Sequence, residues 1–468
     1  MNRLEFPKNP SQPVLRFMEK NLTTGSVWKN LLRFSLPFLL SYFLQSLYGM
    51  ADLFITGQFN ATNSITAVSI GSQVMHMLTV MIVGLAMGAT VNIGQAIGAG
   101  DHDKAAQSVG NTVTLFMTVS VAATILLVAL VQPIVSVMST PAEAVAGTIQ
   151  YLTICFIGIP FITAYNIISS IFRGLGDSKS PMYFVAVACV ANIALDYLFI
   201  GFFRLGPVGA ALGTTISQTI SVIAALISVR KRNTVISLRA EAFRPKRKIM
   251  KPILQVGIPV ALQDGFIQIA FLLITVIANH RGLDDAAAVG IVEKVISFLF
   301  LIPSTMLSTV SALAAQNIGA GRHDRAMETL RYAVAICACF GLVVAVAVQF
   351  IAEPIVALFD GTPAVVLSGG QYLRGYIWDC VFAGIHFCFS GFFCAYGKSG
   401  ISFLHNTLSI LLVRVPGAYF MSKLFASTLL PMGLAAAAGS LLSVLICVAA
   451  FVYLRRRMPE LRGSKENE

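Results

Sequence analysis

Twelve long apolar segments, separated by short polar stretches, account for most of the chain. We predict membrane-spanning helices near residues 30–56, 66–98, 106–132, 145–172, 181–202, 207–229, 252–279, 286–316, 327–352, 370–396, 401–425 and 432–454. Each segment is long enough to cross a hydrocarbon core of roughly 30 Å at a rise of about 1.5 Å per residue. The pattern therefore predicts an all-α membrane protein with twelve transmembrane helices.

The second half of the chain repeats the first. The segment Gln95–Gly100 (QAIGAG) recurs 221 residues later as Gln316–Gly321 (QNIGAG), and Pro37 in the first span matches Pro259 in the seventh. Proline removes a backbone donor, so we expect Pro37 to kink its span or to open the first turn. We assign structural or gating roles to both prolines and to the repeated glutamines, Gln95 and Gln316.

The repeat defines two six-helix lobes, at residues 28–230 and 251–455. Because six spans return the chain to its starting side, both lobes enter the membrane from the same face. They are then related by a pseudo-two-fold axis along the membrane normal, an arrangement that commonly encloses a central cavity. Two complete lobes also predict a functional monomer.

The composition supports a membrane location: 56% of residues are hydrophobic and 12% are charged. Soluble domains carry roughly 25% charged residues. The eight cysteines lie in apolar segments, which indicates reduced thiols without a disulfide framework or a zinc site. We expect no cofactor.

The 33 Lys and Arg residues outnumber the 21 Asp and Glu residues. The basic residues cluster between spans and near the ends, as the positive-inside rule predicts for cytosolic segments, which argues against a nucleic-acid partner. We predict a multi-pass protein of the cytoplasmic (inner) membrane, with a cytosolic tail at 1–27, a basic cytosolic linker at 231–250 and a cytosolic tail at 456–468. We expect no cleaved signal peptide, and residues 1–27 form either a helix on the membrane surface or a mobile tail.

Ionisable side chains inside spans are costly and mark candidate functional sites. Asp196 lies one helical turn after Asn192 on the fifth span, so both side chains share one face. Asp52 lies near the far end of the first span, and Thr214 lies in the first turns of the sixth. If these helices meet, their oxygens suit Na⁺ or, because paired carboxylates retain protons, H⁺. The alternative is a set of unrelated polar groups, each satisfied locally.

The second half does not repeat these acids. By the offset, Asp52 corresponds to Ile274 and Asp196 to Gly417. We therefore expect the N-terminal lobe to couple to the ion and the C-terminal lobe to hold a cationic substrate through Asp264 and Asp379. Arg414, in the eleventh span, has a structural role in which it pairs with one of the aspartates.

Four features of the sequence occur together: the two repeats of six spans, the QNIGAG segment followed by a basic residue, Arg173–Asp177 after the fourth span, and Arg414-Val415-Pro416. In this combination the chain resembles the multidrug and toxic compound extrusion (MATE) family. Asn192 and Asp196, with Asp52, also resemble the DinF-like branch. The resemblance implies a V-shaped pair of lobes, alternating access, and export of amphipathic, often cationic compounds against inward-moving H⁺ or Na⁺.

A lipid-linked oligosaccharide or amphiphile flippase of the same broad superfamily is the alternative. A flippase of this kind calls for a strongly basic cavity, whereas the spans offer mainly Lys294 and Arg414. An enzyme is disfavoured because the spans contain no HExxH, GxSxG or Walker A motif. The departures from exact symmetry, Asp101 against Arg322 and Arg173 against Cys394, are expected to shape contacts between lobes or loops.

Overall fold

The computed structural model describes residues 15–17, 20–231 and 236–461. The first half contains α1 (Val27–Phe59), α2 (Thr62–Gly98), α3 (His102–Ala129), α4 (Val131–Val137), α5 (Ala142–Ile157), α6 (Ile159–Gly174), α7 (Lys179–Asp196), the π-helical η1 (Tyr197–Phe202) and α8 (Pro207–Lys231). The second half contains α9 (Arg247–Asn279), α10 (Leu283–Leu299), α11 (Leu301–Gly319), α12 (His323–Ala357), α13 (Pro363–Tyr376), α14 (Asp379–Ala395), α15 (Ser399–Ser409), the π-helical η3 (Ile410–Arg414), α16 (Val415–Leu424) and α17 (Leu430–Arg457).

Eleven helical segments in the described part of the chain are long and apolar enough to cross a membrane, and the bent pair α5–α6 makes a twelfth. The predicted all-α architecture of twelve spans in two repeats is confirmed. The fourth span bends by 49° between α5 and α6. Pro160, in the first turn of α6, explains the break, because its ring removes a backbone donor. The eighth and tenth spans are likewise divided, into α10–α11 and α13–α14.

Pro37 lies inside the first span. Helix α1 begins at Val27 and continues through Pro37 to Phe59, so the proline opens no turn, and the predicted kink stays a prediction. Pro259 likewise lies inside the unbroken α9. Each proline removes one backbone hydrogen bond from its helix without ending it.

A two-stranded antiparallel sheet joins the N-terminal segment to the linker. Strand β1 (Leu15–Phe17) pairs with β2 (Ile236–Leu238), and a short 3₁₀ helix, η2 (Ala240–Phe243), follows β2. The prediction of a surface helix or a mobile tail is therefore wrong for residues 15–17, while residues 1–14 lie outside the described part. Helix α9 begins at Arg247, within the range predicted for the linker.

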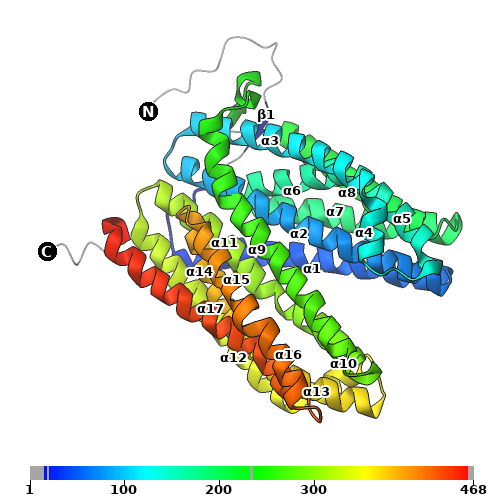
Figure 1. The fold of residues 1–468 in the computed structure, drawn as a ribbon. Helices are drawn as coiled ribbons and strands as arrows, with labels where there is room; N and C mark the ends of the chain where they lie inside the picture. Colours follow the sequence, from blue (N-terminus) through cyan, green and yellow to red (C-terminus); the bar gives the residue numbers. More distant parts are fainter. Residues whose placement is uncertain (1–14, 18–19, 232–235, 462–468) are drawn as a thin grey trace, which may run out of the picture.

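The lobes meet along α2, α9 and α11, with α9 (green) lying between them in Figure 1. Glycines allow this approach: a Cβ on Gly88 would lie 2.0 Å from the carbonyl oxygen of Ile253, and one on Gly257 would lie 2.3 Å from that of Leu85. Away from this seam the lobes diverge, so that α4 and α5 lie far from α10 and α13.

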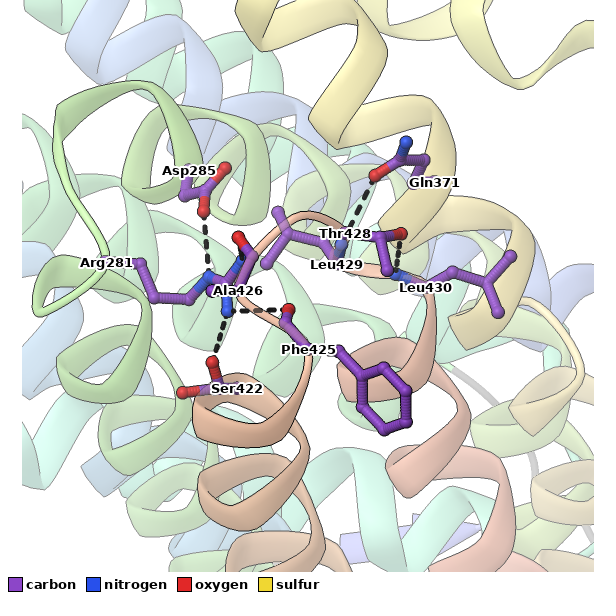
Figure 2. A network of polar contacts seen from close by, with 9 residues as sticks. All are labelled: Arg281, Asp285, Gln371, Ser422, Phe425, Ala426, Thr428, Leu429 and Leu430. Carbon is purple, nitrogen blue, oxygen red and sulfur yellow. Dashed lines mark hydrogen bonds and ion pairs between the residues drawn. The ribbon is translucent and has the colours of Figure 1, made fainter.

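A polar network ties two loops of the C-terminal lobe together at the end where α10 begins (Figure 2). Arg281, in the α9–α10 loop, pairs with Asp285 at 2.8 Å and donates to the carbonyl oxygens of Ser422, Phe425 and Ala426. These carbonyls lie at the C-terminal end of α16, where a helix leaves acceptors unpaired. One guanidinium therefore caps α16 and holds the two loops together.

Candidate functional site

A cavity of about 390 Å³ lies between the lobes. Helices of both lobes line it, and its two carboxylates come from opposite lobes: Asp52 on α1 and Asp264 on α9. Its aromatic lining includes Tyr42, Tyr48, Tyr151, Tyr165, Phe271, Phe300 and Phe387. Among the described residues that line it there is no Lys or Arg. The cavity is therefore acidic and aromatic, a combination that suits an apolar body carrying positive charge.

The four residues of the predicted ion site come together in the N-terminal lobe. Thr214 Oγ1 on α8 donates to Asp52 Oδ2 at 3.1 Å. Asp196 and Asn192, on α7, lie close enough to interact electrostatically with Asp52, although without good hydrogen-bond geometry. Asp52 is only 4% exposed, and Asp196 and Asn192 are fully buried. The structure therefore places these residues together, while their role in ion coupling stays a prediction.

Gly213 makes room for Asp196. A Cβ at this position would lie 2.1 Å from Asp196 Oδ1, so only glycine lets α8 pass this close to the carboxyl group. Asp196 is also the last residue of α7 before the chain continues as the π-helical η1. Such π segments are rare and often mark functional sites, because they shift the side chains that follow.

Most oxygens of this cluster have no hydrogen-bond donor in the described structure. Asp52 Oδ1, both carboxylate oxygens of Asp196 and Asn192 Oδ1 are buried without a partner. Leaving buried polar atoms unpaired is expensive, so these oxygens are available to accept from a water molecule or to hold a proton or a cation. Carboxylate, amide and hydroxyl oxygens form a donor set that fits Na⁺, and two adjacent carboxylates equally fit a shared H⁺.

The two predicted substrate acids have different surroundings. Asp264 lines the cavity and lies against α2, where its Oδ2 is 2.7 Å from the position of a Cβ on Gly84. Asp379 is fully buried at the start of α14 and does not line the cavity. It forms an ion pair with Arg414, with 3.6 Å between Oδ2 and the guanidinium nitrogen. The geometry thus brings Asp264, but not Asp379, to the cavity surface.

Arg414 lies at the centre of a polar cluster in the C-terminal lobe. Besides Asp379, it contacts the Tyr376 hydroxyl and lies 5.2 Å over the ring of Phe271. Arg414 is the last residue of η3, in the span that corresponds by the repeat to the one containing η1. The expected pairing of Arg414 with an aspartate is confirmed, and the pair neutralises the charge on each partner.

The repeated glutamines make equivalent contacts across the lobes. Gln95 Nε2 on α2 donates to the carbonyl oxygen of Ala395 at 2.8 Å, and Gln316 Nε2 on α11 donates to that of Gly174 at 3.0 Å. Gly174 and Ala395 are themselves 221 residues apart. Each half thus ties its second span to the other half at one shared end of the molecule, which we call the contact end.

Glycines close the contact end. A Cβ on Gly98 would lie 1.9 Å from the carbonyl oxygen of Gln316, and one on Gly319 would lie 2.0 Å from that of Gln95. The main chains of α2 and α11 therefore touch, and this explains why the motif places glycine three residues after each glutamine. The repeat pointed to these residues, but the pairing became visible only in three dimensions.

Several cavity residues were not singled out from the sequence. Tyr48 accepts a hydrogen bond from Gln218, and the hydroxyls of Ser72 and Tyr151 lie 3.2 Å apart. His76, which the sequence already marked as an ionisable residue within a span, also lines the cavity. Polar residues that recur at helical spacing within spans are a signal that could have identified this face, but tyrosine is also common in membrane-protein cores.

A family model described as MatE matches the chain twice, over residues 37–198 and 259–420. The two matches are offset by 222 residues, in agreement with the repeat. Among curated relatives, a protein named probable multidrug resistance protein YpnP, from Bacillus subtilis, is 30% identical over 93% of this chain and 96% of its own length. One named multidrug export protein MepA, from Staphylococcus aureus, is 25% identical over 86% of this chain and 89% of its own.

Solved structures share the fold. A multidrug resistance MATE family transporter of the MOP superfamily, in an outward-facing conformation, superposes with a TM-score of 0.86 at 22% identity, covering 95% of this chain and 98% of that one. A MATE structure in the straight conformation gives 0.85 at 23%, with the same coverage. The repeated spans, the cavity between two lobes and the double family match agree, and the chain belongs to the MatE family of multi-pass membrane transporters.

Proposed function

We propose that this protein exports amphipathic, often cationic compounds across the cytoplasmic membrane in exchange for inward-moving H⁺ or Na⁺. The observation that carries the proposal is the position of Asp52. Its carboxyl group belongs both to the lining of the cavity and to the buried oxygen cluster with Asp196 and Thr214. A cation that binds the cluster therefore changes the charge at the wall of the substrate cavity, which gives the two ligands a means of competing.

Alternating access is the conformational half of the proposal. The contact end carries the basic segments between spans, so by the positive-inside rule it faces the cytosol together with both chain termini. The cavity then opens to the outside in this conformation. Ion binding can drive export only if it stabilises one of the two conformations more than the other.

The acidic, aromatic lining supports cationic amphiphiles as the substrate class. Among described residues, Asp264 has no ion-pair partner, so its carboxyl group is available to pair with a cationic ligand. The names of the relatives, which refer to multidrug resistance and export, agree with this class. The flippase alternative is disfavoured because a phosphate-bearing lipid would require basic groups in the described cavity lining, which contains none.

The decisive experiment compares wild type with Asp196→Asn in proteoliposomes loaded with a fluorescent cationic dye. We impose a H⁺ gradient and a Na⁺ gradient separately. Dye movement that one gradient drives, and that is lost in the variant while the variant remains folded, is the expected result and identifies the ion. Equal, gradient-driven transport by the variant would remove Asp196 from the coupling site.

A second measurement tests the substrate class. Asp264→Asn removes the unpaired charge from the cavity wall, so export of cationic compounds should fall about tenfold more than export of neutral ones, a difference of roughly 1.4 kcal/mol in binding. Equal losses for both classes would contradict an electrostatic role for Asp264. Glu143→Gln, on the exposed first turn of α5 and away from the cavity, is the matched control.

A further inference from the structure

The segment that precedes the first span crosses the contact end and touches both lobes. These residues, 20–25, which we call the bridging segment, run in extended and bent conformations before α1 begins at Val27. Chain connectivity does not require them to contact the C-terminal lobe, since α1 belongs to the N-terminal one. Their contacts therefore need a separate explanation.

On the N-terminal lobe the bridging segment lies against the loop between α6 and α7. Lys20 donates its backbone N–H to the carbonyl oxygen of Leu175 at 2.8 Å, and its ammonium group pairs with Asp177 at 2.8 Å. Burial alone would raise the pKa of the Asp177 carboxyl, but hydrogen bonds from Lys20 and Ser180 outweigh it and hold the pKa below its usual value. The carboxylate is thus charged at neutral pH.

On the C-terminal lobe the same segment contacts the repeated motif. Leu22 donates its backbone N–H to Gln316 Oε1 at 3.1 Å, and Arg322 donates to the carbonyl oxygen of Thr23 at 2.7 Å. Arg325 donates to the carbonyl oxygen of Gly25 at 2.9 Å. The Leu22 side chain is 8% exposed and packs in a core made largely of C-terminal residues.

The internal repeat shows that two residues contacting the bridging segment differ in charge from their equivalents in the other half of the chain. The position equivalent to Arg322 is Asp101, and the one equivalent to Asp177 is Lys398, so both charges are reversed in the other copy. The departure at Arg322, which the sequence left without a defined partner, is explained by its contact with the bridging segment. The two halves of the repeat therefore differ in charge at two of the positions that contact the bridging segment.

We propose that the bridging segment holds the contact end closed and must leave one lobe before that end can open. The inference rests on the proposed alternating-access function and adds to it an element outside the twelve spans. Opening would separate the α6–α7 loop from α12, and a segment of six residues with hydrogen bonds to both cannot follow both. Its contacts therefore favour the conformation in which the cavity opens away from the contact end.

The test measures the distance between the lobes directly. Spin labels at Asp103→Cys and Asp324→Cys report on the contact end, because both residues are exposed, lie in the first turns of α3 and α12, and do not contact the bridging segment. Cys339, the exposed native cysteine among the described residues, is replaced by Ser. Pulsed EPR of the full-length protein in lipid then gives the ratio of open to closed contact ends.

We expect Lys20→Ala combined with Leu22→Ala to raise the open-to-closed ratio by about tenfold. Arg325→Ala should raise it in the same direction by removing contacts from the opposite lobe, so the result does not depend on one variant. Lys104→Ala is the matched control: it is the repeat equivalent of Arg325 and should leave the ratio unchanged.

An unchanged ratio in both the double variant and Arg325→Ala would overturn the proposal. The readout requires no substrate or ion gradient, so it is independent of the transport assay. If the ratio shifts as expected while no gradient drives dye movement in wild type, the bridging role stands and the proposed antiport is wrong.

Discussion

Gly213 on α8 lies directly against the carboxyl group of Asp196 on α7. The missing side chain of Gly213 leaves the space that Asp196 Oδ1 occupies, since a Cβ there would lie 2.1 Å away. Gly213→Ala should therefore displace the carboxylate and reduce ion-coupled efflux by about tenfold or more, without changing any charge. Gly290→Ala, where a Cβ meets nothing within 4 Å, is the control, and equal activity of both variants would argue against a tightly fitted ion site.

Asp379 is better explained by its partner than by a substrate. Asp379→Asn leaves the largely buried Arg414 without its counter-charge, so we expect a loss of roughly 2–4 kcal/mol in stability, seen as a lower midpoint of thermal unfolding. Removing both charges, with Asp379→Asn and Arg414→Gln together, should recover much of the lost stability. The role assigned from the sequence instead predicts normal stability and a selective loss of cation export, so one unfolding experiment together with one efflux assay separates the two.

At the scale of helices, α2 and α11 meet through the backbones of their last turns. Gly319→Ala places a methyl group 2.0 Å from the carbonyl oxygen of Gln95, where backbone rather than a flexible side chain must move. We expect the labels at the contact end to move apart in this variant. Gly400→Ala, on the first turn of α15 and free of neighbours within 4 Å, should not change the distance. A closed contact end in Gly319→Ala would mean that the added methyl group is accommodated there without separating α2 from α11.

The network around Arg281 fixes another part of the C-terminal lobe. Arg281→Ala removes donors from three carbonyl groups at the end of α16 (Figure 2), so amide hydrogen exchange in residues 422–430 should accelerate by about tenfold or more. Arg204→Ala, in an exposed loop of the other lobe, should not affect these amides. Unchanged exchange in Arg281→Ala would mean that the loop is held by packing alone.

At the scale of the whole molecule, the distribution of basic residues predicts that the contact end lies on the cytosolic side of the membrane. With this end in the cytosol, a membrane-impermeant maleimide added to intact cells should label Asp284→Cys, in the exposed first turn of α10, but not Asp103→Cys. Inverted vesicles should give the opposite result. Labelling of Asp103→Cys from outside would reverse the topology, and with it the direction of the proposed export.

The sequence by itself determined the twelve spans, the repeat and the residues of the candidate ion site. Each is carried by local information: apolar length, a constant offset, and carboxylates too costly to bury without purpose. The Asn192 and Asp196 spacing placed both side chains on one helical face, and Asp52 and Thr214 joined them as predicted. The breaks within spans were harder to predict from the sequence, because proline alone does not specify them. Pro160 coincides with a break between two helices, whereas Pro37 lies in an unbroken helix.

Only the tertiary structure decided which polar groups pair and which face the cavity. Asp264 and Asp379 are both aspartates within apolar spans of the C-terminal lobe. Asp264 nevertheless lines the cavity and Asp379 pairs with Arg414, because their helices place them next to different neighbours. The contacts of the bridging segment could not be predicted from the sequence either. Leu22 donates to Gln316 and Thr23 accepts from Arg322, and hydrogen bonds between residues almost 300 positions apart leave no local pattern. Contacts of this range depend on how the two lobes pack, and lobe packing is set by the whole chain.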